Sequence, residues 1–230
     1  MNPDPALVAA LAQSVLPPGL AVVARDPRLR PDTTDPSEEA AVRGAVPARV
    51  AEFHSGRAAA RAAMIALGLP PRPVPMGPDR APVWPDGVSG SISHMPAACV
   101  AVVGRADDWA GIGIDIEQAT ALDPVLIGEI TTRAERLWLG TQLPTERGLM
   151  AKLIFSAKEA VYKAQYPLSG QLFGFDTLCL RIDRNTSRFE AEFLIAQGPF
   201  KVGTRLQGAY VHAAGVLLTG VALLHDEIWR

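Results

Sequence analysis

The sequence contains few of the residues that build a disulfide scaffold or a zinc site. Its 230 residues include two cysteines, Cys99 and Cys179, and four histidines. Both cysteines lie in apolar runs, which favours buried free thiols over a disulfide bond. No cysteine or histidine spacing typical of zinc ligands occurs. The fold must therefore be stabilised by an ordinary apolar core.

Long apolar runs and a strong charge imbalance are also missing. No run is long enough to span a bilayer. The formal net charge is −2, so the overall charge indicates neither a nucleic acid nor an anionic membrane as partner. The apolar segment 6–16 has no basic residues before it and contains Gln13 and Ser14, which predicts an amphipathic helix rather than a signal peptide. We therefore expect a cytoplasmic protein that binds neither nucleic acid nor membrane.

The chain is long enough for one or two domains with a substantial core. Apolar periodicity predicts helices at 6–16, 37–42, 49–67, 124–140 and 145–165. Alternating segments predict strands at 20–24, 88–93, 97–103, 112–116, 175–182, 188–196, 203–207 and 211–224. Segments 25–47 and 69–86 are rich in proline and predict loops. The order is mixed α and β, with a polar link at 104–108 that suggests two halves, 1–107 and 108–230.

The segment from Gly111 to Glu117 carries the most specific signal. Residues i and i+2 of a strand share a face, so Asp115 and Glu117 point to one spot, and Gly113 would let a ligand approach the backbone closely. Two converging carboxylates repel each other unless a cation lies between them, and oxygen ligands favour magnesium. The alternative is a strand whose acidic face is solvated.

Two further segments carry candidate phosphate ligands. Ser93 and His94 end a predicted strand and can both donate to phosphate oxygens, His94 when protonated. The alternative for His94 is a residue that only caps the strand. Arg49, Arg57 and Arg61 lie on a predicted helix, and guanidinium groups bind phosphate bidentately. The alternative for these arginines is a solvated helix face.

A third segment, Phe155 to Lys163, contains a pair of opposite charges. Glu159 and Lys163 are four residues apart and share a helix face. Alone, this pair is typical of a surface ion pair worth a few tenths of a kcal/mol.

Together these segments resemble a known family. Gly-Ile-Asp-Ile-Glu at 113–117 and Phe-Ser-Ala-Lys-Glu-Ala-Val-Tyr-Lys at 155–163 resemble the signature of the 4′-phosphopantetheinyl transferases. Trp84-Pro85-x-Gly87, Gly90-Ser91-x-Ser93-His94 and Gly56-Arg57-x-x-Ala60 resemble the larger, single-chain Sfp/EntD type. The similarity covers about residues 49–165, and Phe155 stands where the family often has tryptophan.

The resemblance implies an α/β (α+β) fold of two similar, pseudo-twofold halves with coenzyme A bound between them. It implies that Asp115, Glu117 and Glu159 hold Mg²⁺, and that Lys163 contacts the pyrophosphate and assists the leaving group. The phosphate contacts it implies are Arg49, Arg57, Arg80, Ser93, His94 and Lys158.

The implied reaction moves the phosphopantetheine arm of coenzyme A to a serine of an acyl or peptidyl carrier protein. Glu159, directly or through a metal-bound water, is the candidate base. Fatty-acid, polyketide and nonribosomal-peptide carriers, including siderophore pathways, all remain open, and the family expectation is a monomer. The alternatives are a magnesium-dependent nucleotide (coenzyme A) pyrophosphatase and a non-catalytic module that binds coenzyme A or a carrier protein.

Overall fold

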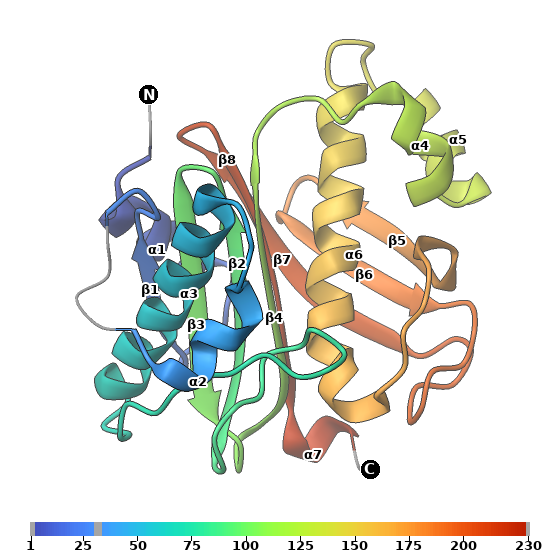
Figure 1. Ribbon diagram of the computed structural model, residues 1–230. Helices are drawn as coiled ribbons and strands as arrows, with labels where there is room; N and C mark the ends of the chain where they lie inside the picture. The colour runs from blue at the N-terminus through green and yellow to red at the C-terminus, as the bar shows by residue number, and fades with distance from the viewer. Residues whose placement is uncertain (1–2, 30–33, 229–230) are drawn as a thin grey trace.

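Two antiparallel sheets, each carrying one long helix, make up the computed structural model, which describes residues 3–29 and 34–228 (Figure 1). One sheet has the strand order β1-β3-β2 and the other β4-β8-β7-β6-β5. The first comes from the N-terminal part of the chain and the second from the C-terminal part. The predicted α/β fold of two halves is therefore confirmed.

The N-terminal half packs α3 against its sheet. Its elements are α1 (Pro5–Ser14), β1 (Ala21–Arg25), α2 (Pro36–Glu39), the 3₁₀ turn η1 (Ala40–Val42), α3 (Pro47–Ala66), β2 (Val88–Met95) and β3 (Ala98–Arg105). Helices α1 and α2 begin at an aspartate whose side chain accepts a backbone N–H, followed by proline in the first turn. The expected loop 25–47 holds α2 and η1, and its residues 30–33 lie outside the described part of the chain.

The C-terminal half packs α6 against β4 and β8. Its elements are β4 (Trp109–Gln118), α4 (Pro124–Ile130), α5 (Arg133–Gly140), α6 (Arg147–Ser169), the 3₁₀ turn η2 (Phe175–Thr177), β5 (Leu178–Asp183), β6 (Arg188–Phe193), β7 (Arg205–Ala213), β8 (Val216–Leu224) and α7 (His225–Ile228). In the described residues, no helix combines the length and apolar character needed to cross a membrane.

Two predicted boundaries were wrong. The helix expected over 124–140 is two helices, because Thr131 is extended and Thr132 starts α5 with a capping box to Glu135. The break between the last two strands lies at Ala214 and Gly215, which both have positive φ as in a two-residue hairpin turn. Periodicity does not reveal either break, since both depend on local turn chemistry.

Strand β4 separates two differently packed surfaces. Ile112, Ile114 and Ile116 are fully buried in a core with α1 and β8. The other face of β4 carries Gly111, Gly113, Asp115 and Glu117 and lies under α6. The alternation of one apolar and one acidic face is as predicted from the sequence.

Candidate active site between the two sheets

The two sheets meet along β2 and β4 through serine side chains. Ser91 Oγ accepts a hydrogen bond from the backbone N–H of Ile114 at 3.1 Å, and Ser93 Oγ accepts one from that of Ile116 at 3.4 Å. These hydroxyls satisfy strand amides that a neighbouring backbone would normally pair. The junction therefore holds the sheets together and places Ser93 beside the acidic face of β4.

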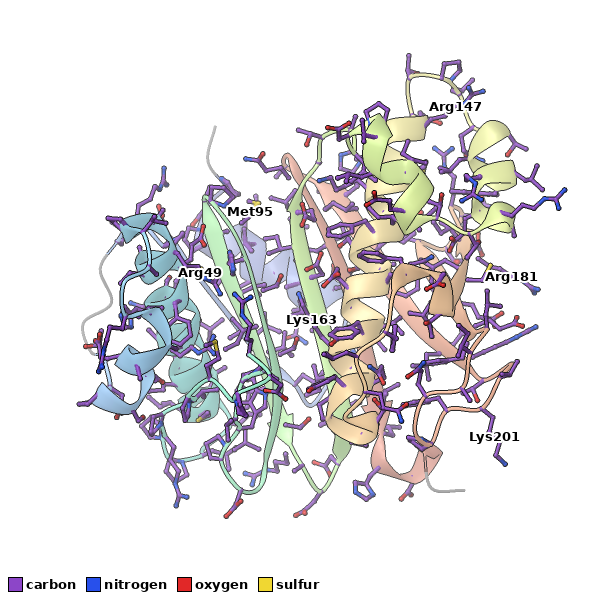
Figure 2. All side chains as sticks on the ribbon, turned by 45° about the vertical axis from the view of Figure 1, so that its right-hand side comes forward. Arg49, Met95, Arg147, Lys163, Arg181 and Lys201 are labelled. Carbon is purple, nitrogen blue, oxygen red and sulfur yellow. The ribbon has the colours of Figure 1, made fainter. Side chains whose placement is uncertain are left out.

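A cleft of about 860 Å³ lies over this junction. It is bounded by α3, the loop between α3 and β2, strands β2 and β4, and α6. Figure 2 shows Lys163 at the centre of the molecule, between the two halves. The candidate residues that line the cleft are Arg49, Arg57, Arg80, Ser93, His94, Asp115, Glu117, Glu159 and Lys163.

Helix α6 runs along β4 in a regular register. A methyl group on Gly111 would meet Ala164 O at 2.0 Å, and one on Gly113 would meet Ala160 O at 1.8 Å. Further along, Ser156 bonds Asp115 and Lys152 bonds Glu117. Two strand residues and four helix residues both advance by about 6–7 Å, so each inward residue of β4 faces the next turn of α6.

This register explains the two glycines differently from the sequence prediction. Gly113 was expected to admit a ligand to the strand backbone. It instead admits the backbone of α6, because the carbonyl oxygen of Ala160 occupies the place of a side chain. The close approach brings Ser156 and Lys163 of α6 within hydrogen-bonding distance of Asp115.

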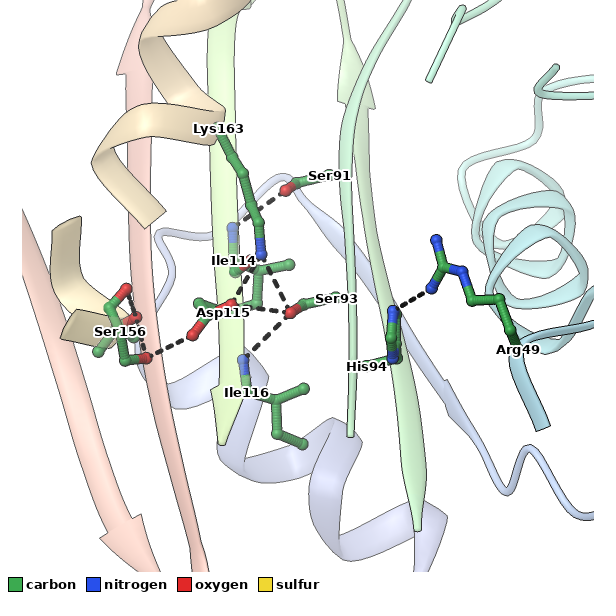
Figure 3. A network of polar contacts seen from close by, with 10 residues as sticks. Arg49, Ser91, Ser93, His94, Ile114, Asp115, Ile116, Ser156 and Lys163 are labelled. Carbon is green, nitrogen blue, oxygen red and sulfur yellow. Dashed lines mark hydrogen bonds and ion pairs between the residues drawn. The ribbon is translucent and has the colours of Figure 1, made fainter. Parts of the chain in front are cut away.

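Asp115 is the most completely bonded carboxylate of the site (Figure 3). Its Oδ1 accepts from Lys163 Nζ at 2.7 Å and from Ser93 Oγ at 2.9 Å, and its Oδ2 accepts from Ser156 Oγ at 2.8 Å. Lys163 also donates to Ser93 Oγ and to Ile114 O, both at 3.1 Å. Lys163 thus reaches across to β4 and β2 rather than forming the ion pair with Glu159 that their spacing allowed.

Burial and neighbouring carboxylates disfavour the negative charge of the other two acidic residues, Glu117 and Glu159. Burial and the nearby charge of Asp115 raise the pKa of Glu117, although Lys152 lies 3.2 Å away and opposes this. Burial is also the largest cause of the raised pKa of Glu159; Lys163 opposes it, and the charges of Asp115 and Glu117 add to it. A cation among the three carboxylates would relieve this repulsion.

The donor set therefore fits a hard cation in its chemistry, since all three groups are carboxylates next to an open cleft. In the described residues, no three histidine, cysteine, aspartate or glutamate side chains are gathered closely enough to hold a metal ion. Asp115 and Glu117 each have an oxygen paired with a lysine, Lys163 and Lys152 respectively. Metal binding would require these carboxylates to exchange lysine ammonium groups for the ion.

Cationic side chains occupy the other side of the cleft, on α3 and β2. Arg57 is 8% exposed, donates from Nε to Val74 O at 3.0 Å and stacks on Phe53 with its guanidinium carbon 4.0 Å from the ring centroid. Burial lowers its pKa to about 10, so it remains a cation at neutral pH. Arg80 lies in the loop facing α6, with a positive φ of 69°.

His94 and Arg49 meet at the rim of the cleft. Arg49 NH1 lies 2.5 Å from His94 Nε2. Burial, more than any nearby charge, lowers the pKa of His94, so its ring is neutral here. Arg61, the third arginine considered for phosphate binding, donates instead to both carboxylate oxygens of buried Glu38 at 2.7 Å.

Comparison with known proteins agrees with this arrangement. Residues 37–104 match the family model for the 4′-phosphopantetheinyl transferase N-terminal domain, and residues 111–215 match that of the 4′-phosphopantetheinyl transferase superfamily. The chain is 40% identical over 199 residues to the 4′-phosphopantetheinyl transferase Svp of Streptomyces mobaraensis, an alignment that covers 82% of this chain and 78% of Svp. The chain belongs to the 4′-phosphopantetheinyl transferase family.

Two further relatives align with this chain over shorter or less similar stretches. The transferase PptT of Mycobacterium tuberculosis is 34% identical over 195 residues, which cover 82% of this chain and 85% of PptT. Enterobactin synthase component D of Salmonella typhimurium is 42% identical over 123 residues, covering 50% of this chain and 48% of that protein.

In this transferase, one residue of the signature lies away from the cleft. Lys158 was expected to face the phosphates, but it is 2% exposed and its Nζ donates to Ile130 O, Glu135 Oε2 and Phe175 O at 2.8–2.9 Å. Its neighbour Glu159 points to the cleft because successive helix residues differ by about 100° in direction. The structure therefore corrects the expectation for Lys158, which joins α6 to α5 and η2.

Three residues that contact the candidate groups were not predicted. Ser156 holds Asp115 from inside the signature segment, Lys152 holds Glu117 one turn earlier on α6, and Glu52 lies beside His94 and Arg49. The i,i+3 spacing of Arg49 and Glu52 on a predicted helix was the one available signal for Glu52. Nothing in the sequence indicates that α6 runs in register with β4, which is what identifies Ser156 and Lys152.

Proposed function

We propose that this transferase moves the phosphopantetheine arm of coenzyme A to a serine hydroxyl of an acyl or peptidyl carrier protein, releasing adenosine 3′,5′-bisphosphate in a magnesium-dependent reaction. The observation that carries the proposal is the cleft between the two halves. One wall carries three carboxylates and Lys163, and the other carries the arginines and His94. This separation suits a substrate with a pyrophosphate at one end of its nucleotide and a 3′-phosphate at the other.

Asp115, Glu117 and Glu159 would hold Mg²⁺. Bound magnesium supplies charge neutralisation for the pyrophosphate and for the departing bisphosphate. In our proposal the division at 107/108 separates a half that binds the nucleotide from a half that carries the carboxylates.

Glu159 is the proposed base for the attacking serine. Within the described part of the chain its carboxylate has no hydrogen bond, unlike those of Asp115 and Glu117. Its carboxylate lines the cleft, where it would accept the serine proton directly or through a metal-bound water. The serine proton would pass to Glu159 as the serine oxygen bonds to the β-phosphorus.

The cations would position the substrate and offset its charge. Lys163 lies against Asp115 and Ser93, where it would neutralise charge on the leaving phosphate. Ser93 and His94 would bind phosphate, and Arg49 and Arg57 the 3′-phosphate. Arg80 would add a phosphate contact from the loop between α3 and β2. Arg57 needs little reorganisation for this role, because Val74 and Phe53 already hold its guanidinium plane.

The carrier partner is proposed from the family and from the names of relatives. One relative is named enterobactin synthase component D, which points to siderophore biosynthesis as one pathway to test for this chain. Exposed apolar side chains on α4 and α5, including Val125 (79% exposed) and Leu137 (67%), offer a docking surface beside α6. We propose a cytoplasmic monomer.

Mass spectrometry of an apo carrier protein tests the function. After incubation with coenzyme A and Mg²⁺, the carrier should gain about 340 Da, the mass of the arm left after phosphoryl transfer. Fatty-acid, polyketide and siderophore carriers should be assayed in parallel. Release of bisphosphate at the same rate with and without a carrier would favour a pyrophosphatase. Binding of coenzyme A without either product would favour a binding module.

A further inference from the structure

Glu52, His94 and Arg49 form a compact group at the rim of the cleft. Glu52 Oε2 lies 3.3 Å from His94 Nδ1 and 3.7 Å from Arg49 NH1. Arg49 NH1 lies 2.5 Å from His94 Nε2 (Figure 3). Arg49 and Glu52 are one turn apart on α3, and His94 comes from β2, so two elements assemble the group.

These contacts determine the tautomer of His94. A guanidinium N–H can only donate, so Nε2 of His94 must accept from Arg49. The ring proton then lies on Nδ1, which faces the carboxylate of Glu52. A neutral ring of this kind offers Nε2 to a donor and cannot donate from Nε2 to a phosphate oxygen.

The charged and titratable groups around His94 come from four elements: Glu52 and Arg49 on α3, Lys163 on α6, Asp115 on β4, and Cys99 opposite it on β3. Burial is the largest cause of the lowered pKa of His94, and Arg49 and Lys163 also lower it. Glu52 opposes them and does so more strongly than Asp115. Cys99 adds no charge, because burial raises its pKa to about 12.

We propose that Glu52 is a positioning residue that holds the Nδ1–H of His94, so that Nε2 takes up one proton when a phosphate group of coenzyme A enters between His94 and Arg49. The proposal rests on the proposed function, in which coenzyme A is the substrate. The proton comes from solvent and forms an N–H bond at Nε2. Arg49 transfers its hydrogen bond from Nε2 to a phosphate oxygen, and His94 donates a second one.

The physical basis is a balance of charge on the two sides of the ring. A doubly protonated imidazole needs an anion at each N–H to offset its burial. Glu52 is in place on the Nδ1 side before the ligand binds, and the phosphate supplies the second anion. Without the carboxylate of Glu52, the ring would stay neutral and Nε2 would present a lone pair to the phosphate.

Proton-linked calorimetry tests this role. Coenzyme A is titrated into the protein with Mg²⁺ at about pH 8, above the ordinary histidine pKa, in two buffers of different ionisation enthalpy. We expect Glu52→Gln to take up about one proton fewer than the wild type and to bind coenzyme A about tenfold more weakly, as for one lost charge-assisted hydrogen bond. Glu129→Gln, the same substitution on the exposed surface of α4, should match the wild type.

A second variant separates positioning from general destabilisation. The His94→Gln variant should also take up about one proton fewer than the wild type when it binds coenzyme A. Adding Glu52→Gln to His94→Gln should change neither the proton uptake nor the affinity further. Thermal melts verify folding, and Glu52→Asp, which keeps the charge, should restore part of the proton uptake.

Wild-type proton uptake in a folded Glu52→Gln variant would overturn the role of Glu52, as would additive losses in the double variant. Failure of the wild type to bind coenzyme A would instead overturn the proposed substrate. The two failures are therefore distinguishable in one experiment.

Discussion

Replacing Lys158 by methionine should destabilise the protein without weakening coenzyme A binding directly. Lys158 and Glu135 are both about 1% exposed at their side chains, with 2.9 Å between Nζ and Oε2. Methionine keeps the apolar stem but leaves Glu135 without its counter-charge and the carbonyls of Ile130 and Phe175 without a donor. Removing one partner of a buried ion pair costs about 3–5 kcal/mol.

For a chain of this size the loss corresponds to a melting temperature lower by roughly 6–20 °C, at about 2–4 °C per kcal/mol. Calorimetric melts of Lys158→Met and of Lys201→Met, an exposed lysine at the edge of the molecule (Figure 2), measure it. Adding Glu135→Gln should recover part of the loss, because the unpaired buried charge is then removed while the amide oxygen still accepts from Leu180 N.

The affinity of the folded Lys158→Met protein for coenzyme A should stay within about twofold of the wild type, since its Nζ lies outside the cleft. A variant with wild-type melting temperature and an affinity lowered by about tenfold or more would refute this reasoning, because one charge-assisted phosphate contact has about that value. Lys158 would then be a phosphate ligand after all.

Three further predictions follow from the cleft and its supports. Arg57→Ala should weaken coenzyme A binding by about tenfold or more, yet change binding of dephospho-coenzyme A, which lacks the 3′-phosphate, by less than about twofold; equal losses would remove the 3′-phosphate role. Gly113→Ala should lower the free energy of unfolding by several kcal/mol, because the new Cβ would meet Ala160 O at 1.8 Å. The control Gly128→Ala has open space around its Cβ and should be neutral or stabilising. Equal stabilities of the two variants would contradict the α6–β4 register. Burial raises the pKa of the Cys99 thiol to about 12. At about pH 8 a thiol reagent should therefore modify Cys99 only after the protein unfolds, with Cys99→Ser as the control. Rapid modification of Cys99 in the native protein would contradict its burial.

The fold was largely readable from the sequence where local pattern decides structure. The isoleucines of β4 alternate with acidic residues, and the strand has one buried and one acidic face as predicted. The division of 124–140 into α4 and α5 was missed, because a capping box at Thr132 overrides a continuous apolar pattern. The place of the last hairpin was missed because Ala214, a residue that rarely adopts positive φ, forms the turn.

The candidate site shows a similar limit. The residue types and their order along the chain indicated a phosphate cleft, and all of the predicted residues except Lys158 and Arg61 line it. Glu159 and Lys158 are neighbours on α6, but their side chains point in different directions, and Lys158 bonds Glu135 outside the cleft. The packing of α6 on β4 is what brings Lys163 to Asp115 rather than to Glu159. Contacts of this kind depend on tertiary register, which spacing in one segment does not contain.

Comparing carrier modification by the wild type and by Asp115→Ala shows whether transfer depends on the Asp115 carboxylate. Both proteins are incubated with coenzyme A, Mg²⁺ and an apo carrier, and the carrier is weighed by mass spectrometry after their folding has been verified by thermal melts. We expect a modified serine with the wild type and none with Asp115→Ala, whose site would lack the carboxylate that Ser93, Ser156 and Lys163 hold in place. Transfer by a folded Asp115→Ala protein at a rate near that of the wild type would contradict it.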